Sequence, residues 1–284
     1  MVHDEALLKR SLYAISDLHL GHAANRAALM ELPAFPQDWL LLAGDVGETA
    51  EQLEFALRLL SRRFAQILWT PGNHDLWTLP KLGDDRRGEA KYQHLVEICR
   101  RYGVVTPEDP YPIWSEAGFE AILAPIFVLY DYSFRPDQVP EDQALAWAAE
   151  TDLVCADELL LHADPYRSRA AWCEARCRLT EERLQQAADG RPFIIMSHFP
   201  LSRDLAVLPR IPRFSIWCGT RRTEPWLERF PIKVAIYGHL HIRNSLVRHG
   251  VRFEEVSLGY PNQWDQQRGV AGYLRRIELE WTNA

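Results

Sequence analysis

Six short and largely apolar segments constrain the fold of this chain more than any other feature of its sequence. Several are apolar at every position rather than at alternate ones, which is typical of strands covered on both faces. Helix-like stretches lie between them, such as ETAEQLEFALRLLSRRF with Thr49 placed to cap its start. Strands that alternate with helices predict an α/β core. The predicted strands are Leu12–Ile15, Trp39–Ala43, Gln66–Trp69, Glu120–Leu123, Phe193–Met196 and Val234–Tyr237.

Two regions depart from this alternation. After Ser245, the stretches SLVRHGVRFEEVSLGY and VAGYLRRIELEW predict antiparallel strands with turns at Gly250 and near Gly269. The segment 136–190 is rich in Ala, Leu, Glu and Arg and predicts helices over 141–162 and 166–188. We interpret it as a helical insertion or lid; the alternative is a pair of ordinary crossover helices before the next strand. The whole chain, 1–284, is treated as a single domain.

Composition and charge exclude several classes of function. Hydrophobic residues make up 47% of the 284 residues and charged residues 25%, as in ordinary globular proteins. The net charge of −7 disfavours long nucleic acids as partners, because Lys and Arg provide most of the affinity for phosphate backbones. No signal peptide is evident, and no apolar run approaches the roughly 18–20 residues of a membrane span. The five cysteines do not suggest a disulfide framework, and we expect a cytoplasmic protein.

Side chains of the types that bind metals follow five of the predicted strands. The stretches after these strands read SDLHLGH, GDVGE, PGNHD, SHFP and GHLHI. Because the carboxyl ends of strands in open α/β sheets converge on one crevice, residues far apart in sequence can meet there. Residues i and i+2 of a strand point the same way, which suits the Asp-x-His and His-x-His pairs as ligands. The side chains concerned are Asp17, His19, Asp45, Asn73, His74, His198, His239 and His241.

Taken in order, these patterns resemble those of the calcineurin-like metallophosphoesterases: D-x-H, G-D, G-N-H-[DE], H and G-H-x-H. The resemblance covers residues 11–76 and 191–260 and leaves out the helical segment between them. It implies a four-layer αββα sandwich of two mixed β-sheets, within the α/β (α+β) class, and a dinuclear metal centre at one edge. The implied ligands are Asp17, His19 and His241 for one metal and Asn73, His198 and His239 for the other. Asp45 would bridge the two, because a carboxylate offers two equivalent anionic oxygens.

The cofactors implied are two divalent transition-metal ions. Imidazole and carboxylate ligands without thiolates suit Mn, Fe, Zn, Co or Ni better than Mg or Ca. The implied activity is that of a metal-dependent phosphoric ester hydrolase acting on a small or medium organic phosphate. In such enzymes two ions about 3.5–4 Å apart activate a bridging hydroxide for in-line attack on phosphorus.

Two further sets of residues are predicted to act on the substrate. His74 follows a ligand without being one, and the resemblance gives it transition-state stabilisation and proton donation to the leaving oxygen. Glu48, three residues after Asp45, stands where some relatives carry an Asp that orients this histidine. For substrate contacts we predict His22 and the arginines that follow SHFP, because guanidinium groups bind phosphate bidentately: Arg203, Arg213, Arg221 and Arg222.

Other functions fit the same residues. The metal ligands serve monoesterases and diesterases alike, so a phosphodiesterase or pyrophosphatase acting on a nucleotide or lipid headgroup is the alternative. A function of a different class also fits these residues: a catalytically silent scaffold or binding protein of the same fold. Such a protein is expected to lose ligands, whereas the full set is present here.

Overall fold

The computed structural model describes residues 10–116 and 118–278. The strands are β1 (Leu12–Ile15), β2 (Phe35–Leu42), β3 (Phe64–Trp69), β4 (Ile113–Glu116), β5 (Phe119–Pro125), β6 (Phe193–Met196), β7 (Ile232–Tyr237), β8 (Asn244–Arg248), β9 (Val251–Glu255) and β10 (Arg275–Arg276). The α-helices are α1 (Ala23–Met30), α2 (Ala50–Leu60), α3 (Gly88–Arg101), α4 (Ala144–Ala149), α5 (Asp157–Leu160), α6 (Arg169–Ala187) and α7 (Trp226–Arg229). Short 3₁₀ helices are η1 (His74–Leu76), η2 (Pro80–Leu82), η3 (Glu141–Gln143), η4 (Arg203–Leu205), η5 (Pro212–Trp217), η6 (Arg221–Thr223), η7 (Gln266–Arg268) and η8 (Val270–Tyr273).

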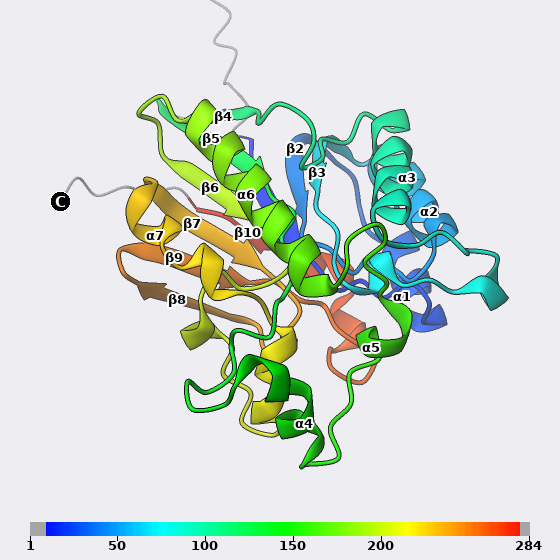
Figure 1. Cartoon of the computed structure of the whole chain (residues 1–284). Helices are drawn as coiled ribbons and strands as arrows, with labels where there is room; N and C mark the ends of the chain where they lie inside the picture. The colour runs from blue at the N-terminus through cyan, green and yellow to red at the C-terminus, as the bar shows by residue number, and fades with distance from the viewer. Residues whose placement is uncertain (1–9, 117, 279–284) are drawn as a thin grey trace, which may run out of the picture.

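Two mixed sheets form the centre of the molecule. One has the strand order β10-β1-β2-β3 and the other β4-β5-β6-β7-β9-β8. Figure 1 shows α2 and α3 beside β2 and β3, and α6 lying across the strands of the larger sheet. Apolar side chains from both sheets, such as Leu41, Leu123 and Ile236, form one buried cluster. Each such side chain stabilises the fold by about 1.5–3 kcal/mol when fully buried. The expected αββα sandwich of two mixed sheets is confirmed.

The segment 136–190 contains one long helix and several short turns. The predicted helix over 141–162 is wrong as a single element, because the chain breaks after α4 and passes through Asp152 at φ 54° before α5. The second predicted helix is confirmed as α6, whose start is capped by the Ser168 side chain. Since β5 and β6 are parallel, a crossover connection must join them, and α6 provides it. The part before α6 is therefore additional to the crossover, and its role as a lid stays a prediction.

The C-terminal region differs from the predicted succession of neighbouring strands. β8 and β9 pair as an antiparallel hairpin around Gly250, as expected. After Gly269, however, the chain forms a 3₁₀ helix and then the two-residue β10, which pairs with β1 in the other sheet. The last residues of the predicted strand, 279–281, lie outside the described residues. Within residues 10–116 and 118–278, no helix has the length and apolar character needed to cross a membrane.

Candidate metal centre

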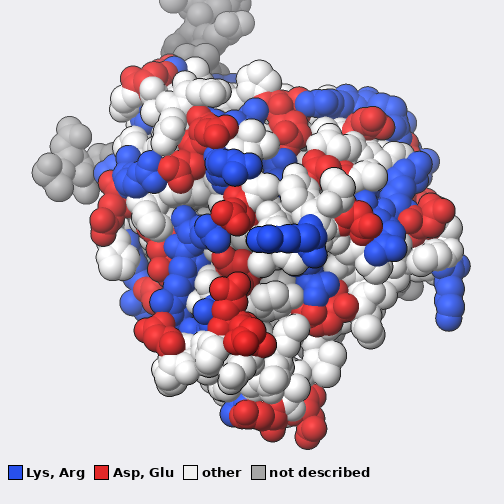
Figure 2. All heavy atoms as spheres, in the orientation of Figure 1, with Lys and Arg blue, Asp and Glu red and all other residues white. Residues whose placement is uncertain are grey.

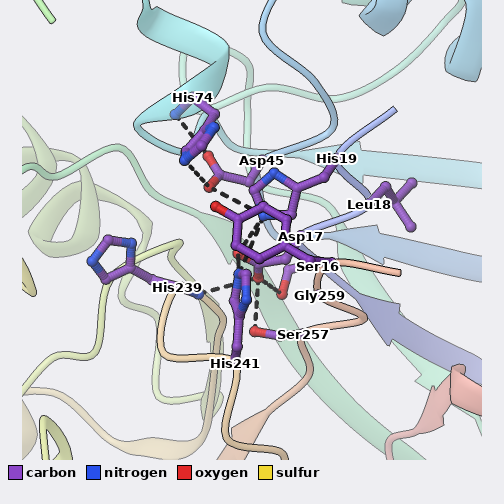
Figure 3. Close-up of polar contacts among 12 residues, drawn as sticks. Ser16, Asp17, Leu18, His19, Asp45, His74, His239, His241, Ser257 and Gly259 are labelled. Carbon is purple, nitrogen blue, oxygen red and sulfur yellow. Dashed lines mark hydrogen bonds and ion pairs between the residues drawn. The ribbon is translucent and has the colours of Figure 1, made fainter. Parts of the chain in front are cut away.

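The polar side chains that follow the strands meet at one edge of the two sheets. β1, β2 and β3 run parallel to one another, and so do β6 and β7, so their carboxyl ends point the same way within each sheet. Figure 3 shows Asp17 and His19 after β1, Asp45 after β2, and His241 after β7 turned toward a common centre. The structure thus brings together side chains separated by more than two hundred positions, as the sequence predicts.

The backbone is strained at this edge. Eight non-glycine residues of the described ranges have positive φ, and five of them are candidate ligands, with φ between 43° and 69°: Asp17, His19, Asp45, His239 and His241. Left-handed backbone is unfavourable for such residues and persists where the surrounding structure imposes it, which is common at functional sites. Gly44, with φ 85°, allows the close approach of the next loop, because a Cβ atom there would lie 2.6 Å from the Gly72 nitrogen.

Asp17, His19 and His241 form the first group of candidate ligands. His241 Nε2 lies 3.0 Å from Asp17 Oδ1 and 3.2 Å from His19 Nε2, and His19 Nε2 lies 3.8 Å from Asp17 Oδ1. Metal–ligand bonds of about 2.0–2.2 Å place neighbouring ligand atoms at such separations. His241 Nδ1 donates to Gln263 Oε1 at 2.7 Å, so Nε2 faces the centre. Burial acts to lower the pKa of His241, but the charge and hydrogen bond of Asp17 raise it, so a cation at the centre would take the place of a proton on Nε2. These three side chains therefore fit one cation.

Asn73, His198 and His239 form the second group. Asn73 Oδ1 lies 3.2 Å from His198 Nε2 and 3.1 Å from His239 Nδ1. His198 Nδ1 lies 2.9 Å from the Ala43 carbonyl oxygen, which can only accept, so Nδ1 carries the proton of the neutral ring. Burial lowers the pKa of His198, which keeps the ring neutral. Two acceptor atoms, Nε2 and Oδ1, then face each other at 3.2 Å, and a cation between them would satisfy both.

Asp45 lies between the two groups. Its Oδ2 is 3.5 Å from His198 Nε2 and 4.0 Å from His19 Nε2. Burial raises the pKa of Asp45 well above its ordinary value, and the charges of Asp17 and Asp75 raise it further. An ionised Asp45 beside Asp17 therefore requires nearby positive charge. The arrangement of carboxylates and neutral imidazoles suits cations at this position.

The sequence analysis did not predict the residues that support the ligands. Asp75 is buried, and its carboxylate accepts backbone hydrogen bonds at 2.9 Å from Gly72, 2.8 Å from Asp45 and 3.1 Å from Val46. It thereby ties the loop after β3 to the loop after β2. In the sequence, Asp75 is the last position of the PGNHD stretch. Ser257 Oγ similarly donates to Asp17 Oδ2 at 2.8 Å.

His74 and Glu48 lie together at the rim of the centre. His74 Nε2 is 4.0 Å from Asp45 Oδ2, and His74 Nδ1 is 3.7 Å from Glu48 Oε1. Burial acts to raise the pKa of Glu48, but the nearby imidazole of His74 outweighs it and lowers the pKa. The ring of Trp77 lies against that of His74 with centroids 3.6 Å apart. The structure thus places the predicted pair in contact and fixes the imidazole from one face.

A cavity of about 320 Å³ opens onto these residues. Its lining combines polar side chains, among them Asp45, Asn73 and His74, with a set of apolar side chains that we call the apolar wall. Such a mixture of a few convergent polar groups and an apolar wall is usual for ligand sites. The apolar wall is lined by Trp77, Val154, Leu208, Ile211, Phe214 and Leu240.

The predicted substrate contacts lie outside the lining of this cavity. His22 is exposed and its ring is 5.5 Å from that of Tyr260, which does line the cavity. Each of the four arginines has a carboxylate partner: Arg203 and Arg221 pair with Asp137, Arg213 with Glu150 and Arg222 with Asp131. The geometry thus gives these arginines structural partners, and their role in substrate binding stays a prediction.

Comparison with known proteins agrees with this geometry. A sequence model of the calcineurin-like phosphoesterases matches residues 11–243. The chain belongs to the calcineurin-like phosphoesterase family. It is 44% identical over 269 residues, 94% of this chain and 83% of the relative, to the [acyl-carrier-protein] phosphodiesterase PptH of Mycobacterium tuberculosis. It is also similar to a solved structure of phosphopantetheinyl hydrolase (PptH) from Mycobacterium tuberculosis, with 43% identity, a TM-score of 0.90, and 95% of this chain and 96% of the other covered.

Membership of this family settles the class of activity. The chain is a metallophosphoesterase, which confirms the expected phosphoric ester hydrolase and disfavours the catalytically silent scaffold. The described residues include three groups whose ligand atoms lie within 4.8 Å of one another: Asp17, His19 and His241; Asp17, Asp45 and His198; and His19, Glu48 and His74. Residues able to hold metal are thus present at the predicted edge.

Proposed function

We propose that this enzyme binds two divalent transition-metal ions, drawn from Mn, Fe, Zn, Co and Ni, and hydrolyses a phosphodiester. The single observation that carries the metal proposal is the pair of acceptors, His198 Nε2 and Asn73 Oδ1, which face each other at 3.2 Å. The ligand sets are Asp17, His19 and His241 for one ion and Asn73, His198 and His239 for the other, with Asp45 between them. Bound there, two ions supply Lewis-acid activation of the attacking water and of the phosphoryl oxygens.

Removal of metal is expected to lower thermal stability. Without cations, Asp17 and Asp45 are two buried carboxylates in one site, so apo protein loses the stabilisation that binding provides. At about 100 times the dissociation constant, a ligand adds about 2.7 kcal/mol. For a domain of this size that corresponds to a midpoint lowered by about 5–10 °C. Differential scanning fluorimetry before and after chelation, and again after Mn²⁺ is restored, measures the shift; an unchanged midpoint with no recoverable metal contradicts the proposal.

The substrate we propose is the phosphodiester that joins a phosphopantetheine arm to an acyl carrier protein. The 44% identity to an [acyl-carrier-protein] phosphodiesterase supports it, since identity at this level extends over 94% of the chain. The cavity supports it as well, because its apolar wall suits a flexible organic arm rather than a bare phosphate. This proposal replaces the expected small-molecule partner with a protein-bound substrate, and it favours the phosphodiesterase alternative over a monoesterase.

The proposed roles of the chain's own groups follow from this substrate. Hydrolysis breaks the bond between phosphorus and the serine oxygen of the carrier protein, and that alkoxide must gain a proton as it leaves. His74 lines the cavity and donates this proton, while Glu48 orients its imidazole through Nδ1. Incubation of the Mn²⁺-loaded enzyme with phosphopantetheinyl carrier protein tests the proposal: mass spectrometry should show the apo carrier protein and free phosphopantetheine, and an unaltered carrier protein would refute it.

A charge at the apolar rim is expected to impair the protein substrate selectively. Val154 is 70% exposed and lines the cavity, so a glutamate there places an unpaired charge where the arm enters. For Val154→Glu we expect a roughly tenfold loss of kcat/KM on the carrier protein, equivalent to about 1.4 kcal/mol. Hydrolysis of bis(p-nitrophenyl) phosphate should change little. Val247 on β8 is 69% exposed and outside the cavity lining, so Val247→Glu is the matched control; equal effects of both variants would contradict this entry route.

A cytoplasmic location is also proposed. All five cysteines are buried and unpaired, which is the usual state of thiols in a reducing compartment.

The face in Figure 2 mixes positive and negative side chains, with neither sign dominating it. That long nucleic acids are not partners stays a prediction from the net charge.

A further inference from the structure

Asp157 connects the additional segment to the metal centre. It is the first residue of α5, its exposure is 0%, and it lies between β5 and β6, outside the strand-end motifs. Its Oδ1 accepts one hydrogen bond from Asn73 Nδ2 at 2.9 Å and another from Trp77 Nε1 at 2.7 Å. One carboxylate oxygen therefore contacts both a proposed metal ligand and the aromatic ring that packs on His74.

The contact with Asn73 determines which atom of its amide faces the centre. An amide presents an oxygen on one side and an NH₂ group on the other, and only the oxygen can bind a cation. Because Nδ2 donates to the Asp157 carboxylate, Oδ1 is directed at His198 and His239, 3.2 Å and 3.1 Å away. Hydrogen bonds from a ligand to outer carboxylates also raise the ligand's basicity.

The contact with Trp77 fixes the surroundings of His74. The indole plane lies 30° from the imidazole plane, with ring centroids 3.6 Å apart. The hydrogen bond from Nε1 to Asp157 holds the indole in this position. Trp77 also lines the cavity beside His74, so a shift of the indole would change both the position of the imidazole and the shape of the cavity.

The burial of Asp157 is difficult to explain by stability alone. Its second oxygen, Oδ2, is buried without a hydrogen-bond partner among the described residues. A buried carboxylate that is only half satisfied costs free energy, which a purely structural residue would not need to incur. The two donors on Oδ1 belong to the metal centre and to the rim, which is where a positioning residue is useful.

We infer that Asp157 is a positioning residue of the phosphoesterase reaction, through which the segment before α6 orients Asn73 for metal binding and Trp77 against His74. The inference rests on the proposed ligand set. It assigns the segment a role in the reaction that does not require it to move. In the conformation described here, the segment already holds Asn73 through Asp157 and so supports the second metal position from behind.

Three variants separate the two contacts of Asp157. Asp157→Ala removes both, and we expect the affinity for Mn²⁺ at the weaker site to fall by about 10–100-fold, with a lower kcat. Asp157→Asn keeps an oxygen acceptor without the charge and should recover part of both losses. Trp77→Phe removes only the indole donor, so it should lower kcat while the affinity for Mn²⁺ stays at the wild-type value. Isothermal titration with Mn²⁺ gives the first readout. Steady-state kinetics on phosphopantetheinyl carrier protein, whose leaving oxygen needs a proton, give the second.

The control is the neighbouring residue on the same helix. Glu158 interacts with Arg169, Tyr132 and Trp217 but lies outside the cavity lining, so Glu158→Ala disturbs α5 without removing a contact to the centre. Wild-type affinity for Mn²⁺ in Asp157→Ala, or an equal loss in Glu158→Ala, would overturn the inference. Wild-type protein that binds no Mn²⁺ at all would instead refute the proposed metal centre, so the two failures are distinguishable.

Discussion

Asp45→Asn is expected to lose one metal ion per chain and to reduce phosphodiester hydrolysis by about 10³-fold or more. Asp45 Oδ2 faces both ligand groups, at 3.5 Å from His198 Nε2 and 4.0 Å from His19 Nε2. Asparagine offers one neutral oxygen and places an NH₂ group where the second oxygen was. Metal ions contribute several kcal/mol to transition-state stabilisation, and about 4 kcal/mol corresponds to a 10³-fold change in rate.

Elemental analysis and kinetics on the same preparation check this result. Metal content should fall from about two ions per chain to one or fewer, as required if a single carboxylate serves two positions. Asp189→Asn is the control, because Asp189 pairs with Arg191 at the surface and not with the centre. An Asp45→Asn protein with two ions and wild-type turnover would show that the carboxylate is not shared.

The positions of the ligands were predictable because strand topology governs them. Apolar runs gave the ranges of β1 and β6 and the carboxyl-terminal ends of β2, β3 and β7 to within one residue, although β2 begins four residues earlier than predicted. The polar residue after each run lies at a carboxyl end of the sheets. Parallel strands bring such ends together, so spacing along the sequence does not matter. The strained backbone at Asp17 and His239 was not predictable, since φ depends on how the adjacent loops pack.

Residues that act through tertiary contacts were not predictable in the same way. Asp157 follows Cys155 and Ala156 in a segment with no motif, and only the fold brings it to Asn73, 84 positions earlier. The predicted helix across it failed because local composition favours helix, whereas the chain turns at Asp152 and begins again at α5. The arginines illustrate the same point: their charge was visible in the sequence, but the carboxylate partner of Arg221 was not, and their role in substrate binding stays a prediction.

The second large effect is expected for His74. If His74 donates the proton to the leaving oxygen, His74→Ala should lower kcat by about 10²–10⁴-fold, the usual contribution of general acid catalysis. The loss should be greater for an alkoxide leaving group, such as the serine oxygen of a carrier protein, than for p-nitrophenolate, because p-nitrophenolate departs without needing a proton. Glu48→Gln keeps a partner near Nδ1 and should cost less. Turnover on both substrates measures the contrast.

Metal content decides whether this role is correct. His74 Nε2 is 4.0 Å from Asp45 Oδ2, and His74 also belongs to a group with His19 and Glu48 whose ligand atoms lie close together. A ligand role and a proton-donor role therefore predict different results for the same variant. Full occupancy in His74→Ala with a loss that depends on the leaving group supports the proton donor. Emptied metal positions would show that the imidazole serves the cations instead. An equal loss on both substrates with full occupancy would contradict proton donation, because proton donation affects only the bond to the departing oxygen.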